Sequence, residues 1–176
     1  MIEISKIIKN KEHQKIFELA SEIGKKMNIP VYLVGGYIRD AFLQKDSVDI
    51  DIMVGNNVFE FSKALSKDLN VNTTVDFEKF QTSRIPYDGC EIEIANARKE
   101  IYNSNSRKPS KIVKASINED LIRRDFTINT ICMSLNFDNF GKLIDPFYGI
   151  KDINKGIIKT PADPDKTFID DPLRML

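Results

Sequence analysis

Two aspartates, Asp49 and Asp51, stand two residues apart in an apolar stretch of the chain. Side chains two positions apart on a strand point to the same face, so the two carboxylates are expected to converge. The alternate residues are expected to enter the core: Val48, Ile50 and Ile52. Like charges held this close are tolerated when a divalent cation lies between them. An all-oxygen site with room for phosphate suits magnesium, so the spacing predicts that Asp49 and Asp51 bind Mg²⁺.

A glycine pair precedes the aspartates. Residues 31–34 are typical of a short strand, and Gly35 and Gly36 allow the backbone to approach a ligand before a helix that begins near Tyr37. A glycine turn at a helix N-terminus favours phosphate, and Arg39 adds a charged donor. Taken singly, an Asp-x-Asp is usually a solvated strand face and a Gly-Gly is usually a plain turn. Their ordered combination predicts nucleotidyl transfer.

Three further motifs lie in the second half of the chain: Arg123-Arg124-Asp125, Asp145-Pro146, and Asp170-Asp171-Pro172-Leu173-Arg174. Together with the glycine turn and the aspartate pair, they resemble the head of class II tRNA nucleotidyltransferases, the family of CCA-adding enzymes and bacterial poly(A) polymerases. The resemblance extends from about Pro30 to the end of the chain. It implies a polymerase-beta-type nucleotidyltransferase fold and template-independent addition of C and A to the 3′ end of tRNA. The implied ligands are ATP, CTP, Mg²⁺ and a tRNA or other RNA 3′ end.

A third carboxylate is expected beside Asp49 and Asp51, because nucleotidyl transfer needs bridging metal ligands and an activated 3′-hydroxyl. Glu91 and Glu93 share one face of a predicted strand, and the resemblance favours Glu93.

The resemblance also implies that Arg124 contacts the incoming nucleotide, while Asp125 and Asn129 hold the ribose or the arginine. Helix capping and an internal salt bridge are the alternative for Asp125. Asp171 and Arg174, three apart, are expected on one helix face, where they would read the Watson–Crick edge of C or A.

The resemblance predicts a head domain at residues 1–160 and the start of a base-reading neck helix at residues 161–176. Family members continue further, so the chain is expected to be an isolated or truncated head that is inactive by itself. Poly(A) or A-only addition is one alternative, and a non-catalytic nucleotide-binding module is another. A nucleotidyltransferase acting on a small molecule or protein is a third, against which the Arg124 and Asp171 motifs argue.

Composition is consistent with one mixed α/β domain, a mixed sheet with helices packed on it. The chain has 176 residues, with 26 basic and 26 acidic side chains. This balance excludes a strongly basic nucleic-acid-coating protein, so RNA contact must come from a local patch. The stretch from Arg98 to Arg124 is the candidate, with a solvated charged face as the alternative. No segment resembles a signal peptide or a membrane span, so a cytoplasmic protein without membrane contact is expected.

The remaining expectations concern secondary structure and single residues. Helices are predicted at residues 11–27, after residue 37 and at 58–69, the last capped by Asn56 or Asn57. Hairpins are predicted around residues 87–89 and 136–140, and a loop at 103–110. Cys90 and Cys132 are interpreted as reduced core residues. His13 is assigned to a polar helix face, which gives histidine-based catalysis little support.

Overall fold

The computed structural model describes residues 7–101 and 111–175, so the predicted loop at 103–110 lies outside the described residues. The chain forms two compact units. The first comprises the chain up to Asn96 together with Cys132–Ile144, and the second comprises Ala97–Ile131 together with the chain from Asp145 onward. Neither boundary falls at residue 160, and the predicted division there stays a prediction.

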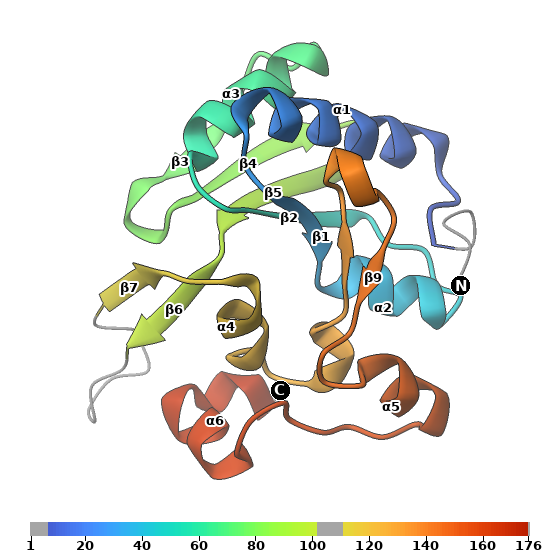
Figure 1. The fold of residues 1–176 in the computed structure, drawn as a ribbon, viewed down its shortest axis with the longest axis vertical. Helices are drawn as coiled ribbons and strands as arrows, with labels where there is room; N and C mark the ends of the chain where they lie inside the picture. The colour runs from blue at the N-terminus through green and yellow to red at the C-terminus, as the bar shows by residue number, and fades with distance from the viewer. Residues whose placement is uncertain (1–6, 102–110, 176) are drawn as a thin grey trace. The chain divides into compact units, whose positions relative to one another are not determined.

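The first unit is built on a seven-stranded mixed sheet with the order β3-β4-β5-β2-β1-β8-β9 (Figure 1). Strands β2 and β5 are parallel, and the other pairings in this sheet are antiparallel. Helices α1 and α3 lie along one face of the sheet in Figure 1. The predicted mixed sheet with packed helices is therefore confirmed. The elements of this unit are α1 (Lys11–Met27), β1 (Val31–Val34), α2 (Gly36–Phe42), β2 (Asp49–Val54), α3 (Val58–Asp68), β3 (Val75–Phe77), the 3-10 turn η2 (Glu78–Phe80), β4 (Thr82–Tyr87), β5 (Cys90–Asn96), β8 (Cys132–Ser134), η4 (Phe137–Asn139) and β9 (Leu143–Ile144).

Alternation along β2 and β5 produces the core of this unit. Ile50 and Ile52 are buried and pair in register with Ile92 and Ile94. The prediction for Val48 is wrong, because β2 begins only at Asp49 and the Val48 side chain is 61% exposed. The apolar face of β2 therefore begins at Ile50 rather than at Val48.

The two predicted hairpins are present. Asp88 and Gly89 join β4 to β5 with φ values of 42° and 77°, and Tyr87 pairs with Cys90. Two consecutive positive φ angles match the right-handed twist of the flanking strands, which explains the Asp-Gly pair. Residues 136–140 lie between β8 and β9, which pair antiparallel.

The predicted helices of the first unit are also present, and one of the two predicted capping residues of α3 occupies the N-cap position without a side-chain capping bond. Asn57 occupies the N-cap position in a left-handed conformation (φ 56°, ψ 43°), and its side chain makes no capping hydrogen bond. The neighbouring Asn56 has a buried Oδ1 without a hydrogen-bond partner in the described part of the chain. Within residues 7–101 and 111–175, none of the helices has the length and apolarity that crossing a bilayer requires.

The second unit combines a two-stranded sheet with short helices. Gly149, the first residue of its helix α5, allows a close approach that a side chain would block: an added Cβ would lie 2.2 Å from the Thr127 carbonyl oxygen. The elements of this unit are β6 (Arg98–Ile101), β7 (Lys111–Lys114), α4 (Ile117–Ile122), the 3-10 turn η3 (Thr127–Asn129), α5 (Gly149–Lys155), α6 (Pro164–Asp170) and the 3-10 turn η5 (Pro172–Met175).

Candidate active site

Strand pairing places the glycine turn beside Asp51. β1 and β2 are antiparallel neighbours, and Val34, the last residue of β1, pairs with Asp51. Gly35 follows with φ 77° and ψ −144°, a backbone region that is essentially restricted to glycine. Gly36 then begins α2, where an added Cβ would lie 3.2 Å from Nη2 of Arg39.

Four carboxylates gather on the other face of β2 and β5 from the buried isoleucines. Asp49 pairs with Glu91 and Asp51 pairs with Glu93 in the parallel register, across strands that lie about 4.8 Å apart. All four residues are at least partly exposed. The structure therefore brings Asp49, Asp51 and both candidate third carboxylates together on one face.

Arg84 of β4 contributes a positive charge to this acidic face. It pairs with Glu93 in the sheet register. Its Nη1 lies 3.1 Å from Oε1 of Glu91, while Nε and Nη2 both lie 3.0 Å from Oε2 of Glu93. Sequence reasoning missed Arg84, because its contact with the acidic strand depends on the hairpin register rather than on any local motif.

The donor chemistry of this face fits a hard divalent cation, since carboxylate oxygens are the ligands that Mg²⁺ prefers. Within residues 7–101 and 111–175, no three His, Cys, Asp or Glu side chains are close enough to form a metal-binding group. Asp49 and Asp51 on β2 supply carboxylate oxygens of this kind, while the Glu93 carboxylate is held by Arg84. On the glycine side, Arg39 is oriented by Asp40, whose Oδ1 lies 2.8 Å from Nε and from Nη2.

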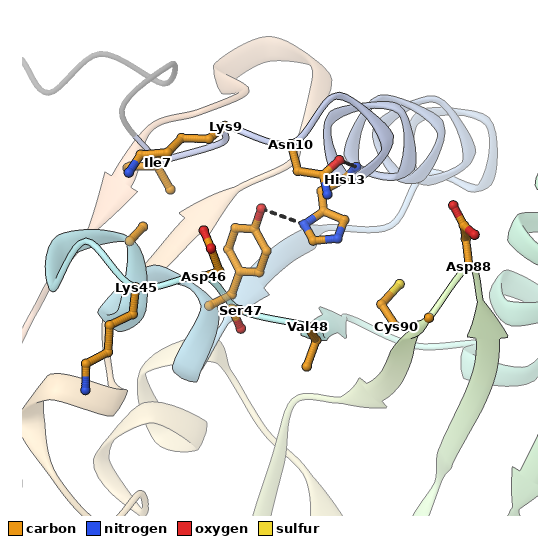
Figure 2. Close-up of a pocket in the computed structure, with 13 residues that line it drawn as sticks. Ile7, Lys9, Asn10, His13, Lys45, Asp46, Ser47, Val48, Asp88 and Cys90 are labelled. Atoms are coloured by element: carbon orange, nitrogen blue, oxygen red, sulfur yellow. Dashed lines mark hydrogen bonds between the residues drawn. The ribbon is translucent and has the colours of Figure 1, made fainter.

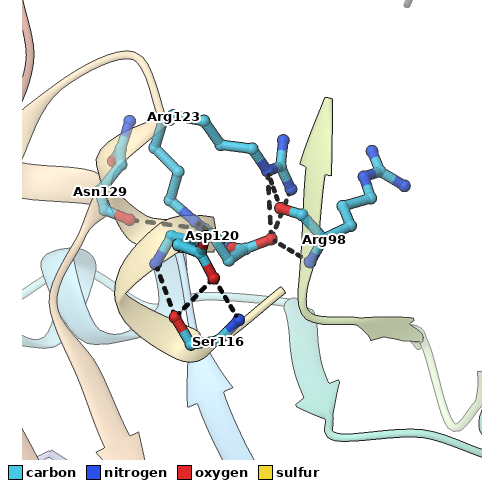
Figure 3. A network of polar contacts seen from close by, with 7 residues as sticks. Arg98, Ser116, Asp120, Arg123 and Asn129 are labelled. Carbon is cyan, nitrogen blue, oxygen red and sulfur yellow. Dashed lines mark hydrogen bonds and ion pairs between the residues drawn. The ribbon is translucent and has the colours of Figure 1, made fainter. Parts of the chain in front are cut away.

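In the second unit, a buried carboxylate organises the arginine motif (Figure 3). Asp120 of α4 is 1% exposed and lies 2.6 Å from Nη2 of Arg123 and 3.2 Å from Nη2 of Arg124. It also accepts a hydrogen bond from the backbone N–H of Arg98. Burial disfavours the charged form of Asp120, but the two arginines and these hydrogen bonds outweigh it and hold the pKa of the carboxyl below its usual value. Sequence reasoning missed Asp120, although its spacing of three and four from the arginines was a usable signal.

The structure places Arg124, Asp125 and Asn129 around the end of α4 and the following turn. The Asn129 amide nitrogen donates to both carboxylate oxygens of Asp125, at 2.9 and 3.1 Å. Arg124 Nη1 lies 3.5 Å from the Asn129 carbonyl oxygen. Asp125 also accepts a hydrogen bond from the Phe126 backbone N–H at 2.7 Å. The internal salt bridge considered for Asp125 is instead made by Asp120 with Arg124.

Asp171 and Arg174 do not share one α-helix face, so that expectation is wrong. Helix α6 ends at Asp170, and Asp171 is extended with φ −149° and ψ 100°. The cause is Pro172, because a proline disfavours the helical conformation of the residue before it. The Asp171 carboxylate instead accepts from the Leu173 backbone N–H at 3.1 Å, and Arg174 Nη1 lies 3.5 Å from the Thr167 carbonyl oxygen.

A pocket of about 340 Å³ lies in the first unit, lined by residues from the start of α1, from α2, from residues 45–48 and from the Asp88-Gly89 turn (Figure 2). His13 is only 9% exposed, and its Nδ1 lies 3.0 Å from the Tyr37 hydroxyl. Its assignment to a polar helix face is therefore wrong, because the first turn of α1 packs against Tyr37. Both cysteines are free as predicted, but Cys132 is buried whereas Cys90 is only half-buried.

Known proteins resemble this chain in sequence. The sequence pattern described as "Poly A polymerase head domain" matches residues 31–159. An A-adding tRNA nucleotidyltransferase from Aquifex aeolicus is 39% identical over 145 residues, which are 82% of this chain and 17% of that protein. A CCA-adding enzyme from Bacillus licheniformis is 36% identical over 154 residues, which are 86% of this chain and 36% of that protein.

Solved structures of CCA-adding enzymes have the same fold. Apo form II of one such enzyme superposes with a TM-score of 0.86 at 36% identity, covering 99% of this chain and 41% of that chain. The Thermotoga maritima CCA-adding enzyme complexed with tRNA gives a TM-score of 0.82 at 34% identity, covering 99% and 39%. A complex of a CCA-adding enzyme with ATP gives 0.82 at 35% identity, covering 99% and 40%.

These likenesses confirm the expected nucleotidyltransferase fold and the resemblance based on the motifs. The chain spans less than half of the length of the proteins compared, from 17% of the Aquifex aeolicus relative to 41% of the apo form II chain. With the family pattern matched from residue 31 to residue 159, this chain belongs to the poly A polymerase head domain family.

Proposed function

We propose that this chain is the catalytic head of a template-independent RNA nucleotidyltransferase that transfers C and A from CTP and ATP to the 3′ end of tRNA. The observation that carries the proposal is the pairing of Asp51 with Val34 on one side and with Glu93 on the other. This pairing sets a carboxylate face next to a glycine turn, and nucleotidyl transfer needs both charge-stabilising ligands and a phosphate-binding backbone. The tRNA-directed names of the relatives support the choice of substrate.

The site residues of the first unit have distinct roles in this proposal. Asp49 and Asp51 would hold Mg²⁺, which when bound supplies charge stabilisation for the phosphates and acidifies the attacking hydroxyl. The backbone N–H of Gly36, following the Gly35 turn, and the guanidinium of Arg39 would bind the triphosphate. Glu93 would be the third carboxylate and would act on the 3′-hydroxyl of the RNA.

Residues of the second unit would make further contacts with the nucleotide. Arg124, held by Asp120, would contact the triphosphate or ribose, and the Asp125–Asn129 pair would contact the ribose. Asp171 would accept a hydrogen bond from the exocyclic amino group of C or A, and Arg174 would donate to a ring nitrogen or carbonyl. Residues 161–176 would belong to a neck segment. A cytoplasmic location is part of the same proposal, since the relatives are named for acting on tRNA.

A-only addition is the second candidate activity. It is favoured by the 39% identity to the A-adding enzyme of Aquifex aeolicus. The two activities differ in the acceptor that they extend. Addition of CMP and AMP to a tRNA that lacks its CCA end indicates CCA addition, whereas addition of AMP only to a tRNA ending in CC indicates the A-adding activity.

The test compares the 176-residue chain with the longest reading frame that contains it. Label incorporation from CTP and ATP into tRNA is measured with Mg²⁺, and nucleotide binding is measured by calorimetry. We expect both proteins to bind ATP and CTP and the longer one to extend tRNA. Binding without incorporation in the longer protein would indicate a nucleotide-binding module, and absence of both would overturn the proposal.

A further inference from the structure

The sheet order separates the two substrates of the proposed reaction. Asp51 has β1 and the glycine turn on one side and β5, β4 and β3 on the other. In-line phosphoryl displacement needs the attacking oxygen and the leaving pyrophosphate on opposite sides of the reacting phosphorus. With the triphosphate at the glycine turn, as the proposed function has it, the RNA 3′-hydroxyl approaches across β5 and β4. The side chains there are then candidates for contacts with the RNA.

Arg84 lies on this part of the sheet and contacts three side chains. Its two ion pairs engage Glu91 and Glu93 from different nitrogens and fix the plane of the guanidinium. Its Cζ lies 5.4 Å from the centre of the Phe77 ring, so the guanidinium is also held against an aromatic side chain. The charge of Arg84 is therefore largely satisfied within the protein, while the orientation of its planar group is set.

Both members of this stack remain accessible. The Arg84 side chain is 43% exposed and Phe77 is 38% exposed. Exposed ion pairs contribute little to stability, so stability alone does not account for the two ion pairs of Arg84. A guanidinium plane is a surface on which nucleobases stack, and stacking accepts any base because every base has a π-face.

We propose that Arg84, supported by Phe77, is the platform on which the 3′-terminal base of the RNA acceptor stacks. The proposal rests on the proposed function. It makes Arg84 a substrate-binding residue on the acceptor side of Asp51, independent of the triphosphate contacts at the glycine turn. Because the charge of Arg84 is already paired with two glutamates, its contribution to RNA binding comes from its planar surface rather than from a phosphate contact.

The test is a double-substitution cycle in the longest reading frame that contains this chain. Arg84→Lys keeps the positive charge and removes the planar group, and the acceptor is a tRNA ending in CC with either an intact or an abasic 3′-terminal nucleotide. For the wild-type protein, the abasic acceptor should raise KM by about 5- to 100-fold. For Arg84→Lys, KM for the intact acceptor should rise similarly, and the abasic change should add little.

Controls separate this inference from the proposed function and from folding. KM for ATP should stay unchanged in Arg84→Lys, and Lys79→Gln, a charge change on the neighbouring η2 turn, should leave KM for the acceptor unchanged. If Arg84→Lys unfolds early in a thermal melt, Phe77→Leu provides a second test with the same expected sign. Equal abasic penalties in wild type and Arg84→Lys would overturn the stacking role, whereas a wild-type protein that extends no RNA would overturn the proposed function instead.

Discussion

Asp51 and Glu93 are in-register partners on the two parallel neighbouring strands at the centre of the seven-stranded sheet. One member of the pair lies next to the strand that leads into the glycine turn, and the other is held by Arg84. This pairing thus places the glycine turn on one side of the acidic face and Arg84 on the other. The proposed chemistry follows this direction, from the triphosphate at the glycine turn to the RNA across β5 and β4.

The two glycines of the turn should respond differently to substitution. Gly35→Ala should destabilise the fold by about 1 to 3 kcal/mol, because φ 77° with ψ −144° is strained for a residue with a Cβ. Gly36→Val should retain the fold, since its Cβ meets the flexible end of Arg39, but should weaken ATP and CTP binding alike by about tenfold or more. Thermal melts and calorimetry measure the two effects, and unchanged nucleotide affinity in Gly36→Val would make the turn merely structural.

Replacement of Asp120 should show that the arginine motif depends on one buried carboxylate. Asp120→Asn leaves Arg123 and Arg124 without their charged partner and should lower the free energy of unfolding by about 3 to 5 kcal/mol at neutral pH. Glu119→Gln, on the exposed side of the same helix, is the control and should cost much less. A denaturant titration showing equal stability losses for both variants would contradict the buried-network interpretation.

The effect of Asp120→Asn should also depend on pH. The pKa of Asp120 is lowered in the folded protein, so its charge stabilises the fold above the unfolded pKa of about 3.9. As the pH falls through the lower folded pKa, this contribution is lost. The difference in the free energy of unfolding between wild type and Asp120→Asn should therefore have its full value at pH 6 and become smaller at acidic pH.

His13 should give a pH dependence in a different range. Burial lowers the pKa of His13, so the unfolded chain binds its proton more readily than the folded protein does. Stability should therefore decrease as the pH falls below the unfolded value of about 6.5, and His13→Gln should reduce this decrease. Melting temperatures at pH 7.5 and pH 5.5 provide the measurement. An equal fall in melting temperature in wild type and His13→Gln would contradict a lowered pKa of His13 in the folded protein.

Local sequence signals predicted the elements that carry the aspartates and the glycines. The alternation of Asp49, Ile50, Asp51 and Ile52 specified both the strand and its two faces, and the Asp-Gly pair specified the hairpin that sets the register of β5. These predictions succeeded because each depends on residues adjacent in the chain.

Long-range packing explains the errors. The burial of His13 depends on Tyr37, and the ion pairs of Arg84 depend on the strand across the hairpin, so periodicity alone could not reveal either. The end of α6 was predictable, because Pro172 disfavours a helical Asp171.

Base selection should depend on Asp171. Asp171→Ala in the longest reading frame should relax the preference for CTP and ATP over GTP and UTP more than it weakens triphosphate binding, because G and U present a carbonyl where C and A present an amino group. Competition binding with all four nucleotides measures the preference. Asp170→Ala, one residue earlier in α6, is the matched control, and an unaltered preference in Asp171→Ala would show that other residues read the base.

In the proposed function the chemistry takes place at the aspartate pair of β2. The most direct measurement of this is single-turnover incorporation of AMP into tRNA by Asp51→Asn in the longest reading frame. The variant keeps the size of the side chain and the strand pairing, so its melting temperature should stay near that of the wild type. Loss of a ligand charge should reduce the rate at least about a hundredfold, because metal-assisted charge stabilisation contributes several kcal/mol. A folded Asp51→Asn protein that incorporates AMP at the wild-type rate would contradict the account.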